Sequence, residues 1–280
     1  MIKINKCVYS SKNKSYAPDE TITFYLDCDN YYQNIFRIML IEYPDSYSFD
    51  NFEMIENTTN IEDELLIHRI KMTPVDSGKV NDASRFVIKV EHPLKSKDPV
   101  KHILSDDIKP FAAGCKGILL ASISAGTKLH LNFGLSKNHG TPQYFPVATP
   151  ISNPEEKKIV LQSVGSVPFK NLVLSAVQNF YIDVYDCIKK LKSGMVLTAG
   201  GATIIQISDC NEYILRFICV FIQDRYPEIP YVEVKRVTYI NRDLKWKIFM
   251  KSGIDKILNE VQIALKKEEK TLVKNIEKVM

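Results

Sequence analysis

The sequence predicts an α+β fold made of two lobes of one design, the first of which is interrupted by a β-rich insert. Residues 36–45 (FRIMLIEYPD) and 215–228 (LRFICVFIQDRYPE) both place an arginine at the start of an apolar helical run, and both end at Tyr-Pro followed by an acidic residue. From about 76 to 155, short alternating runs are separated by turns rich in Gly, Pro, Asn and Lys, which is typical of a small β module. At 280 residues the chain is long enough to bury such a core.

The first lobe begins with a strand at 19–28 (DETITFYLDC), where apolar and polar residues alternate. Helical spacing of apolar residues then predicts a helix from Tyr31 to Tyr43. Pro44 ends this helix because proline cannot continue it and biases the preceding residue away from helical geometry. The same two periodicities predict the other elements of this lobe: a strand at 47–57, a helix at 62–75, a strand at 157–166 and a long helix that Pro168 opens.

Three glycines in KSGMVLTAGG (192–201) predict a linker, after which the order of elements repeats. The repeat consists of a strand at 202–208, a helix at 211–226 ended by Pro227, strands at 231–240 and 244–250, and an amphipathic helix from Ile254 to the C-terminus. The predicted domains are therefore a discontinuous first lobe of 1–75 and 156–192, an insert of 76–155, a linker of 193–201 and a second lobe of 202–280.

Each long helix is too hydrophobic on one face to stand alone, so we expect the two lobes to pack against each other as an intramolecular pseudo-dimer. Tethering raises the effective concentration of the second lobe to roughly millimolar, which favours this docking. The side chains predicted to form the lobe–lobe packing are Phe180, Val184 and Ile188 on the first long helix and Ile257, Val261 and Leu265 on the second.

The charge and the cysteines exclude several classes of protein. The 37 basic residues are offset by 33 acidic ones spread throughout, which argues against a dedicated nucleic-acid binder with a concentrated basic stripe. The six cysteines contain no CxxC or CxH pair, so we expect no zinc site and reduced thiols. Because the start has no apolar signal region and no apolar run approaches about 18 residues, we expect a soluble, intracellular protein without a membrane span.

Motifs for catalysis are absent from the sequence. The five histidines show no HxH or HExxH spacing, and no GxSxG, P-loop or GxGxxG motif occurs. A thiol nucleophile would need a polar, electropositive setting. Cys219 lies in the apolar run FICVFI and is expected in the core, whereas Cys210 stands near Asp209 at the head of a helix. A thiol-dependent enzyme using Cys210 or Cys115 therefore remains an alternative.

Several polar residues allow both a structural and a functional interpretation. His68 and Arg69 can satisfy the last carbonyls of a helix or contact a partner. His139 lies in a Gly/Pro/Lys-rich loop that is either a mobile surface loop or a recognition loop. Arg37 and Arg216 can each pair with a carboxylate or lie in a protein interface, to which the guanidinium is well suited.

Segment 34–75 has Arg37 in its first helix and Pro44 at the end of that helix, then Glu56, Asn57 and Thr58, and then His68 and Arg69. Through these residues the first lobe resembles the assembly-subunit motif of cellular RNA polymerases, shared by the bacterial alpha N-terminal domain, the archaeal D subunit and the eukaryotic third-largest subunit. Phe36 replaces the first arginine of the family's helix. The matching residues are Arg37, Pro44, Glu53, Glu56, Asn57, Thr58, Glu64, His68, Arg69 and Pro74. In the insert, the matches are Ile118, Leu120, Ala121, Gly126, Gly134, Lys137, His139, Pro146, Ala148 and Thr149, with two extra residues between His139 and Pro146.

The second lobe is similar to the eleventh-largest subunit, the archaeal L subunit, through Leu215, Arg216 and Pro227. The family's TLGN signature is missing, and SDCNEYIL stands in its place. The resemblance thus implies two alpha-type dimerisation lobes, normally separate subunits, fused in one chain as in large DNA viruses. Some third-largest subunits hold zinc in the insert, but only Cys115 is present here, so we expect none.

The resemblance implies a non-catalytic assembly platform of a DNA-directed RNA polymerase, a nucleotidyltransferase complex whose Mg²⁺ lies in the catalytic subunits. Its partners would be the largest and second-largest subunits, with a small zinc-binding subunit as a further candidate and DNA or RNA reached only through the complex. The second-largest subunit would contact Arg37, Glu56, Asn57, His68 and Arg69, and the largest would contact Arg216.

The resemblance also marks Lys137 and His139 in the insert loop. A viral protein of this kind would work in the host cytoplasm and the virion, and a cellular one in the nucleus. The rivals to this hypothesis are the thiol-dependent enzyme and a free-standing α/β scaffold protein.

Overall fold

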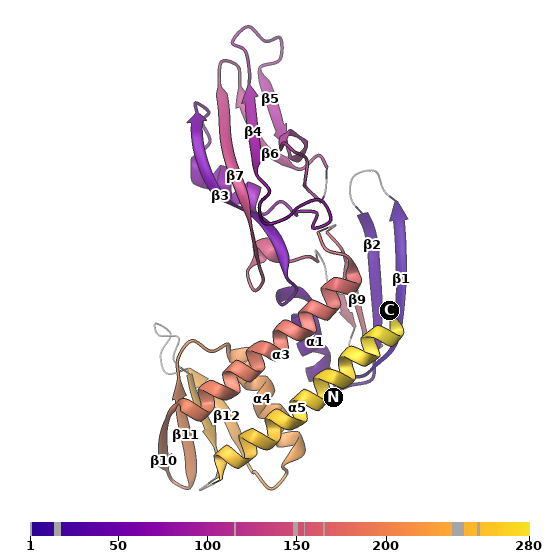
Figure 1. Cartoon of the computed structure of the whole chain (residues 1–280), viewed down its shortest axis with the longest axis vertical. Helices are drawn as coiled ribbons and strands as arrows, with labels where there is room; N and C mark the ends of the chain where they lie inside the picture. Colours follow the sequence, from indigo (N-terminus) through magenta and orange to yellow (C-terminus); the bar gives the residue numbers. More distant parts are fainter. Residues whose placement is uncertain are drawn as a thin grey trace. The chain divides into compact units, whose positions relative to one another are not determined.

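The computed structural model describes residues 2–13, 18–114, 116–147, 151–153, 155–164, 166–236, 244–250 and 253–280 (Figure 1). It contains helices together with antiparallel sheets, which confirms the predicted α+β class. Its contacts divide the chain into two compact units, a first unit of Met1–Val177 with Asn275–Met280 and a second unit of Gln178–Lys274. Of the helices in the described part of the chain, none combines the length and apolar character needed to cross a membrane.

The first unit contains a four-stranded antiparallel sheet in the order β1-β2-β9-β8. Its strands are β1 (Ile4–Asn13), β2 (Pro18–Leu26), β9 (Lys158–Gln162) and β8 (Ile151–Asn153). The sequence analysis missed β1, an edge strand whose described side chains are mostly exposed and therefore show no alternating hydrophobic pattern.

Helix α1 (Asn30–Glu42) follows β2 and ends at the C-cap Tyr43, immediately before Pro44, as predicted. Its apolar residues occur at helical spacing and give it a broad buried face. On this face the ring of Phe36 meets that of Phe24 on β2 edge to face, with centroids 5.5 Å apart, so the helix covers the sheet. Helix α3 (Phe169–Ser193) follows β9 and continues into the second unit.

Between α1 and β8 lies a β-rich body with its own core. It consists of β3 (Ser46–Asn57), α2 (Asp63–Lys71), β4 (Phe86–Glu91), β5 (Val100–Leu104), β6 (Leu119–Ser124) and β7 (Lys128–Asn138), with short 3-10 helices at Ser105–Asp107 and Pro142–Tyr144. One sheet has the order β3-β7-β4, and β5 pairs with β6.

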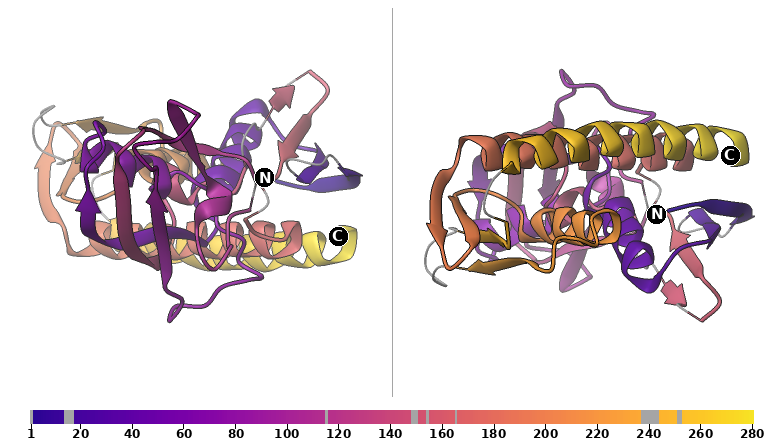
Figure 2. Two further views of the ribbon diagram at one scale, coloured as in Figure 1. Left: turned by 90° about the horizontal axis from the view of Figure 1, so that it is seen from above. Right: turned by 90° about the horizontal axis from the view of Figure 1, so that it is seen from below.

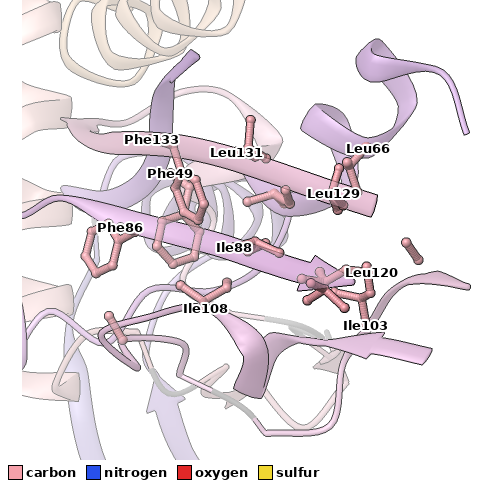
Figure 3. Close-up of a cluster of buried hydrophobic side chains, with 14 of the residues drawn as sticks. Phe49, Leu66, Phe86, Ile88, Ile103, Ile108, Leu120, Leu129, Leu131 and Phe133 are labelled. Carbon is pink, nitrogen blue, oxygen red and sulfur yellow. The ribbon is translucent and has the colours of Figure 1, made fainter. Parts of the chain in front are cut away.

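The rings of Phe49, Phe86 and Phe133 pack together at the centre of this body (Figure 3). Because β3 pairs with β7 along most of its length, this sheet includes residues on both sides of the boundary predicted between 75 and 76. Long-range strand pairing of this kind leaves no mark in a local sequence window, which is why the boundary could not be placed from periodicity.

The second unit contains another four-stranded antiparallel sheet, in the order β10-β11-β13-β12. Its strands are β10 (Met195–Ala199), β11 (Ala202–Ile207), β13 (Leu244–Ile248) and β12 (Val232–Arg236). Helix α4 (Glu212–Arg225) packs against β12 (Figure 1). Trp246 on β13 is fully buried. The predicted strand 231–240 is described only as far as Arg236, since 237–243 lie outside the described residues.

Strand β10 occupies most of the segment that was predicted to be a linker. The sequence Met-Val-Leu-Thr can form a strand, but its exposed position at the sheet edge gives no alternation that would have revealed it. Gly200 and Gly201 then adopt φ of 59° and 80°, the positive values that a two-residue hairpin turn requires, and they join β10 to β11. The glycines therefore mark a tight turn at this point in the chain.

The two four-stranded sheets have the same topology. In each, the first two strands form a hairpin, a helix follows, the next two strands form a second hairpin, and a long helix closes the set. Numbering the strands of each set from one to four gives the spatial order one-two-four-three in both sheets, with antiparallel pairing throughout. The β-rich body from Ser46 to Asn138 is inserted between the helix and the second hairpin of the first set only.

Within the second unit, the long helices α3 and α5 (Ile254–Val279) lie side by side (Figures 1 and 2). The hydroxyl of Tyr185 donates a hydrogen bond of 2.6 Å to the Glu269 carboxylate, and Nζ of Lys192 donates to the side-chain oxygens of Asn259 and Gln262, both at 2.8 Å. The six residues predicted for lobe–lobe packing are all buried, and that role for them stays a prediction. They are Phe180, Val184, Ile188, Ile257, Val261 and Leu265.

Candidate protein-interaction surfaces

Tyr43, Asp45, Lys137 and His139 meet where α1 ends, and together with Arg37 on the same helix we call them the Arg37 patch. The ring of His139 stacks on that of Tyr43 with centroids 5.9 Å apart, and its Nδ1 lies 3.2 Å from Oδ1 of Asp45. Nζ of Lys137 lies 4.0 Å from Oδ2 of the same carboxylate. The insert loop therefore holds two of its polar residues against the Tyr-Pro-Asp sequence that ends the helix.

Arg37 lies on α1, six residues before Tyr43, and presents an oriented positive charge. Its Nε and one terminal nitrogen both donate to Oδ1 of Asn34, at 3.1 and 2.9 Å. Because an amide carries no charge, this contact fixes the plane of the guanidinium without neutralising it. Burial raises the pKa of the Glu42 carboxyl, and the nearby charge of Arg37 opposes that rise. The backbone N–H of Gly140 donates to the Glu42 carbonyl at 2.7 Å, which ties the insert loop to the same helix end.

Three further predicted residues, Glu56 near the end of β3 and His68 and Arg69 on α2, are together called the α2 patch. All three residues are exposed. A terminal nitrogen of Arg69 donates to the Leu120 carbonyl on β6 at 3.2 Å, so this arginine bonds a neighbouring strand rather than the last carbonyls of its own helix. Arg69 thus joins α2 to β6 while part of its guanidinium remains open to solvent.

Asn57, also predicted to contact a partner, holds together the turn between β3 and α2. Its Nδ2 donates to the Ile61 carbonyl at 3.0 Å and to Oδ1 of Asp63 at 2.6 Å. Its Oδ1 accepts bonds from the backbone N–H and the hydroxyl of Thr59, at 3.0 and 2.7 Å. Both polar atoms of the Asn57 side chain are thus hydrogen-bonded within residues 57–63. Asn57 stabilises the turn that leads into α2.

Most of the length of β3 separates Glu56 from the Arg37 patch. Asp45 immediately precedes this strand and Glu56 is near its end. Eleven residues of extended chain span roughly 35 Å at about 3.3 Å per residue. Glu56 is therefore far from the Arg37 patch, whereas the end of α2 lies beside the first half of β3, where the Ser48 hydroxyl donates to the Lys71 carbonyl at 3.0 Å.

Arg216 lies in the second unit on α4, where it shares Glu212 with another arginine. Its Nε and a terminal nitrogen donate to Oε1 of Glu212 at 3.0 and 2.8 Å, while Nε of Arg236 donates to Oε2 at 2.6 Å. The hydrogen bonds from Arg216 and Arg236 lower the pKa of the Glu212 carboxyl. The predicted contact residue is thus held in place by an ion pair, with 56% of its side chain exposed.

Replacing Glu212 with glutamine is expected to lower the free energy of unfolding by about 1 kcal/mol near neutral pH. Since the folded-state pKa of Glu212 is lowered from its ordinary value of 4.5, the stabilisation is complete above pH 4.5 and is lost as the pH falls below it. Urea unfolding of both proteins at about pH 7 and about pH 3 should show the difference shrinking at the lower pH. Glu228→Gln, at an exposed carboxylate of the same unit, is the control. An equal difference at both pH values would contradict the assignment.

The sequence analysis missed three participants in these surfaces. Asp45 and Tyr43 were noted only as parts of a helix ending, although their repeated Tyr-Pro-acid pattern was the available signal. Arg236 was missed because its partner Glu212 lies 24 residues away.

Of the positions matched in the insert, Ala148 and Thr149 lie outside the described residues, as does Cys115. Within the described ranges, no group of three or more His, Cys, Asp or Glu is placed to hold a metal ion.

Neither a scan against protein-family models nor a search of curated protein sequences found a match to this chain.

Proposed function

We propose that this protein is a non-catalytic assembly platform of a DNA-directed RNA polymerase, in which a third-largest-type and an eleventh-largest-type subunit are fused. The observation that carries the proposal is the repeated topology: two four-stranded sheets with the same strand order, each with a short helix after its first hairpin and a long helix after its second. An assembly dimer built from two related subunits would have such a repeat. The proposed family of this repeat rests on the motif resemblance in segment 34–75.

In the proposed platform, both dimerisation lobes belong to one chain, so no second chain is needed for dimerisation. The Arg37 patch and the α2 patch would receive the second-largest subunit, and the face of α4 with Arg216 would receive the largest. A partner that contacts both Glu56 and the Arg37 patch must bridge roughly 35 Å along β3. The two large subunits would supply the catalytic carboxylates and Mg²⁺, and this chain would reach DNA or RNA only through them.

The proposal is tested by replacing Arg37 with alanine and measuring capture of the second-largest subunit by the tagged protein. We expect a loss of at least about tenfold in affinity, because arginines at the centre of an interface often contribute more than about 1.4 kcal/mol. Asn34→Ala is a second test, since it removes the acceptor that orients the guanidinium while keeping the charge.

Arg85→Ala is the matched control, because it removes the same charge from an exposed position of the first unit outside both patches. Circular dichroism melts of the three variants should coincide with that of the unchanged protein. If Arg37→Ala and Arg85→Ala capture the large subunit equally well, the Arg37 patch does not bind it.

A further inference from the structure

Two cysteines of the second unit lie in direct contact. Sγ of Cys187, on α3, is 2.6 Å from Sγ of Cys210, which precedes the N-cap Asn211 of α4. Both are free thiols. A disulfide bond is about 2.05 Å long, so a shift of about half an ångström would bring the sulfurs to bonding distance.

The surroundings give the two thiols different acidities. The hydrogen bond from Cys187 lowers the pKa of the Cys210 thiol, and the charge of Lys190 and the backbone N–H of Asn211 lower it further, against the opposing effects of burial and of Asp183. The same hydrogen bond, together with burial, raises the pKa of the Cys187 thiol. Cys210 is therefore the more acidic thiol of the pair, and Cys187 the less acidic one.

A hydrogen bond to the main chain holds the Lys190 ammonium near Cys210. Its Nζ donates to the Asp209 carbonyl at 2.5 Å, which fixes the ammonium beside the residue that precedes Cys210. Asp209 adopts a positive φ of 52°, so the chain turns sharply just before the thiol. An ammonium group and the amino end of a helix both favour a thiolate over a thiol.

A small cavity of about 150 Å³ adjoins the pair. Its lining includes both cysteines together with Asp183, Asp186 and Lys190. The volume is several times that needed for one water molecule, so a molecule of the size of hydrogen peroxide can enter. Cys210 is partly exposed, whereas Cys187 is buried, and an oxidant arriving from solvent therefore meets Cys210 first.

The other buried thiols differ from Cys210 in acidity. Burial raises the pKa of the Cys219 thiol to about 12 and that of the Cys28 thiol to about 11. Such thiols carry almost no thiolate at neutral pH and react slowly with oxidants. Cys219 lies on α4 in the same unit as the pair, which makes it a matched internal control.

We propose that Cys187 and Cys210 form a reversible two-electron redox site, a dithiol that a peroxide-class oxidant converts to a disulfide linking α3 to the start of α4. In the first step the Cys210 thiolate attacks one peroxide oxygen, the O–O bond breaks, and the departing hydroxide takes up the proton lost by Cys210 to form water. In the second step Cys187 loses its proton and attacks Sγ of the sulfenic acid, the S–O bond breaks, and a second water leaves. The sum is two thiols and one peroxide giving one disulfide and two waters.

The experiment treats the full chain with hydrogen peroxide and then blocks the remaining thiols before digestion with trypsin. The three cysteines of the second unit fall in three different tryptic peptides: 171–189 with Cys187, 193–216 with Cys210 and 217–225 with Cys219. We expect peptides 171–189 and 193–216 to appear as one cross-linked species that has lost two hydrogen atoms and that dithiothreitol separates. The peptide with Cys219 should stay blocked as a free thiol.

Two variants test whether the cross-link is specific to Cys187 and Cys210. Cys187→Ser should abolish the cross-link and leave Cys210 oxidised to sulfenic or higher acids, whereas Cys219→Ser should leave the cross-link unchanged. Since serine is close in size to cysteine, circular dichroism is expected to show both variants folded. The proposal is overturned if peroxide leaves both thiols free, if Cys187 and Cys210 oxidise without joining, or if the cross-link connects other cysteines.

Discussion

Truncating Phe180 to alanine is expected to lower the free energy of unfolding by about 3–5 kcal/mol, the range observed when a buried phenylalanine is removed. Phe180 is 1% exposed on α3, and its ring meets that of Phe217 on α4 edge to face with centroids 5.2 Å apart. The loss combines a cavity between the helices with the loss of this aromatic pair. The effect should appear as a lower midpoint of urea unfolding with an unchanged slope.

Tryptophan fluorescence can follow this urea unfolding. Its single tryptophan, Trp246, lies fully buried on β13 in the same unit, so its fluorescence reports the unfolding of that unit. Ile182→Ala is the matched control, because this side chain lies two residues further along the same helix and is 55% exposed. We expect the control to change stability by less than about 0.5 kcal/mol. Equal effects of the two substitutions would show that Phe180 does not belong to the core of the second unit.

Phe133→Ala is expected to have a similarly large effect in the first unit, again about 3–5 kcal/mol. Phe133 lies on β7, the central strand of its sheet, and is 2% exposed. Its ring has neighbours at 5.2 Å (Phe49), 5.3 Å (Phe52) and 5.8 Å (Phe86), so one substitution removes three aromatic contacts. Figure 3 shows two of these rings, those of Phe49 and Phe86, around Phe133.

Hydrogen exchange of the β3, β4 and β7 amides should detect this loss of stability directly. Ile55→Ala is the control, since Ile55 lies on β3 in the same sheet and is 51% exposed. Because β7 also carries Lys137 toward the Arg37 patch, the Phe133 variant should further weaken capture of the second-largest subunit. Protection factors that are unchanged in Phe133→Ala would contradict the assignment of this cluster as the core of the inserted body.

Helices with one buried face could be predicted from the sequence, whereas two edge strands with mostly exposed side chains were missed. Helices α1, α3 and α5 were found within a few residues of their bounds because each repeats apolar residues at helical spacing over three or more turns. Strands β1 and β10 lie at sheet edges and expose most of their described side chains, so they carry no such pattern. Pairing of β3 with β7 joins residues 72 to 92 positions apart, and local periodicity contains no information about it.

In the candidate sites, contacts between residues close in sequence could be predicted, and contacts between distant residues could not. The ion pair of Arg216 with Glu212 joins residues four apart on one helix and follows from local spacing. The contact of His139 with Asp45 spans 94 residues, and that of Cys187 with Cys210 spans 23 residues and two elements. Sequence reasoning noted Cys210 for its position at a helix start but supplied no partner for it. The structure supplies that partner through the packing of α3 beside the turn before α4.

The most direct test of the platform proposal is to purify the tagged protein from its native source, or after co-expression with candidate large subunits, and to identify what accompanies it by mass spectrometry. The account predicts that two large chains co-purify and that the complex synthesises RNA on a DNA template with Mg²⁺ present. A monomeric protein that brings down no large chain and shows no template-dependent synthesis would contradict it. The paired cysteines would remain testable in that isolated protein, because their chemistry depends only on the second unit.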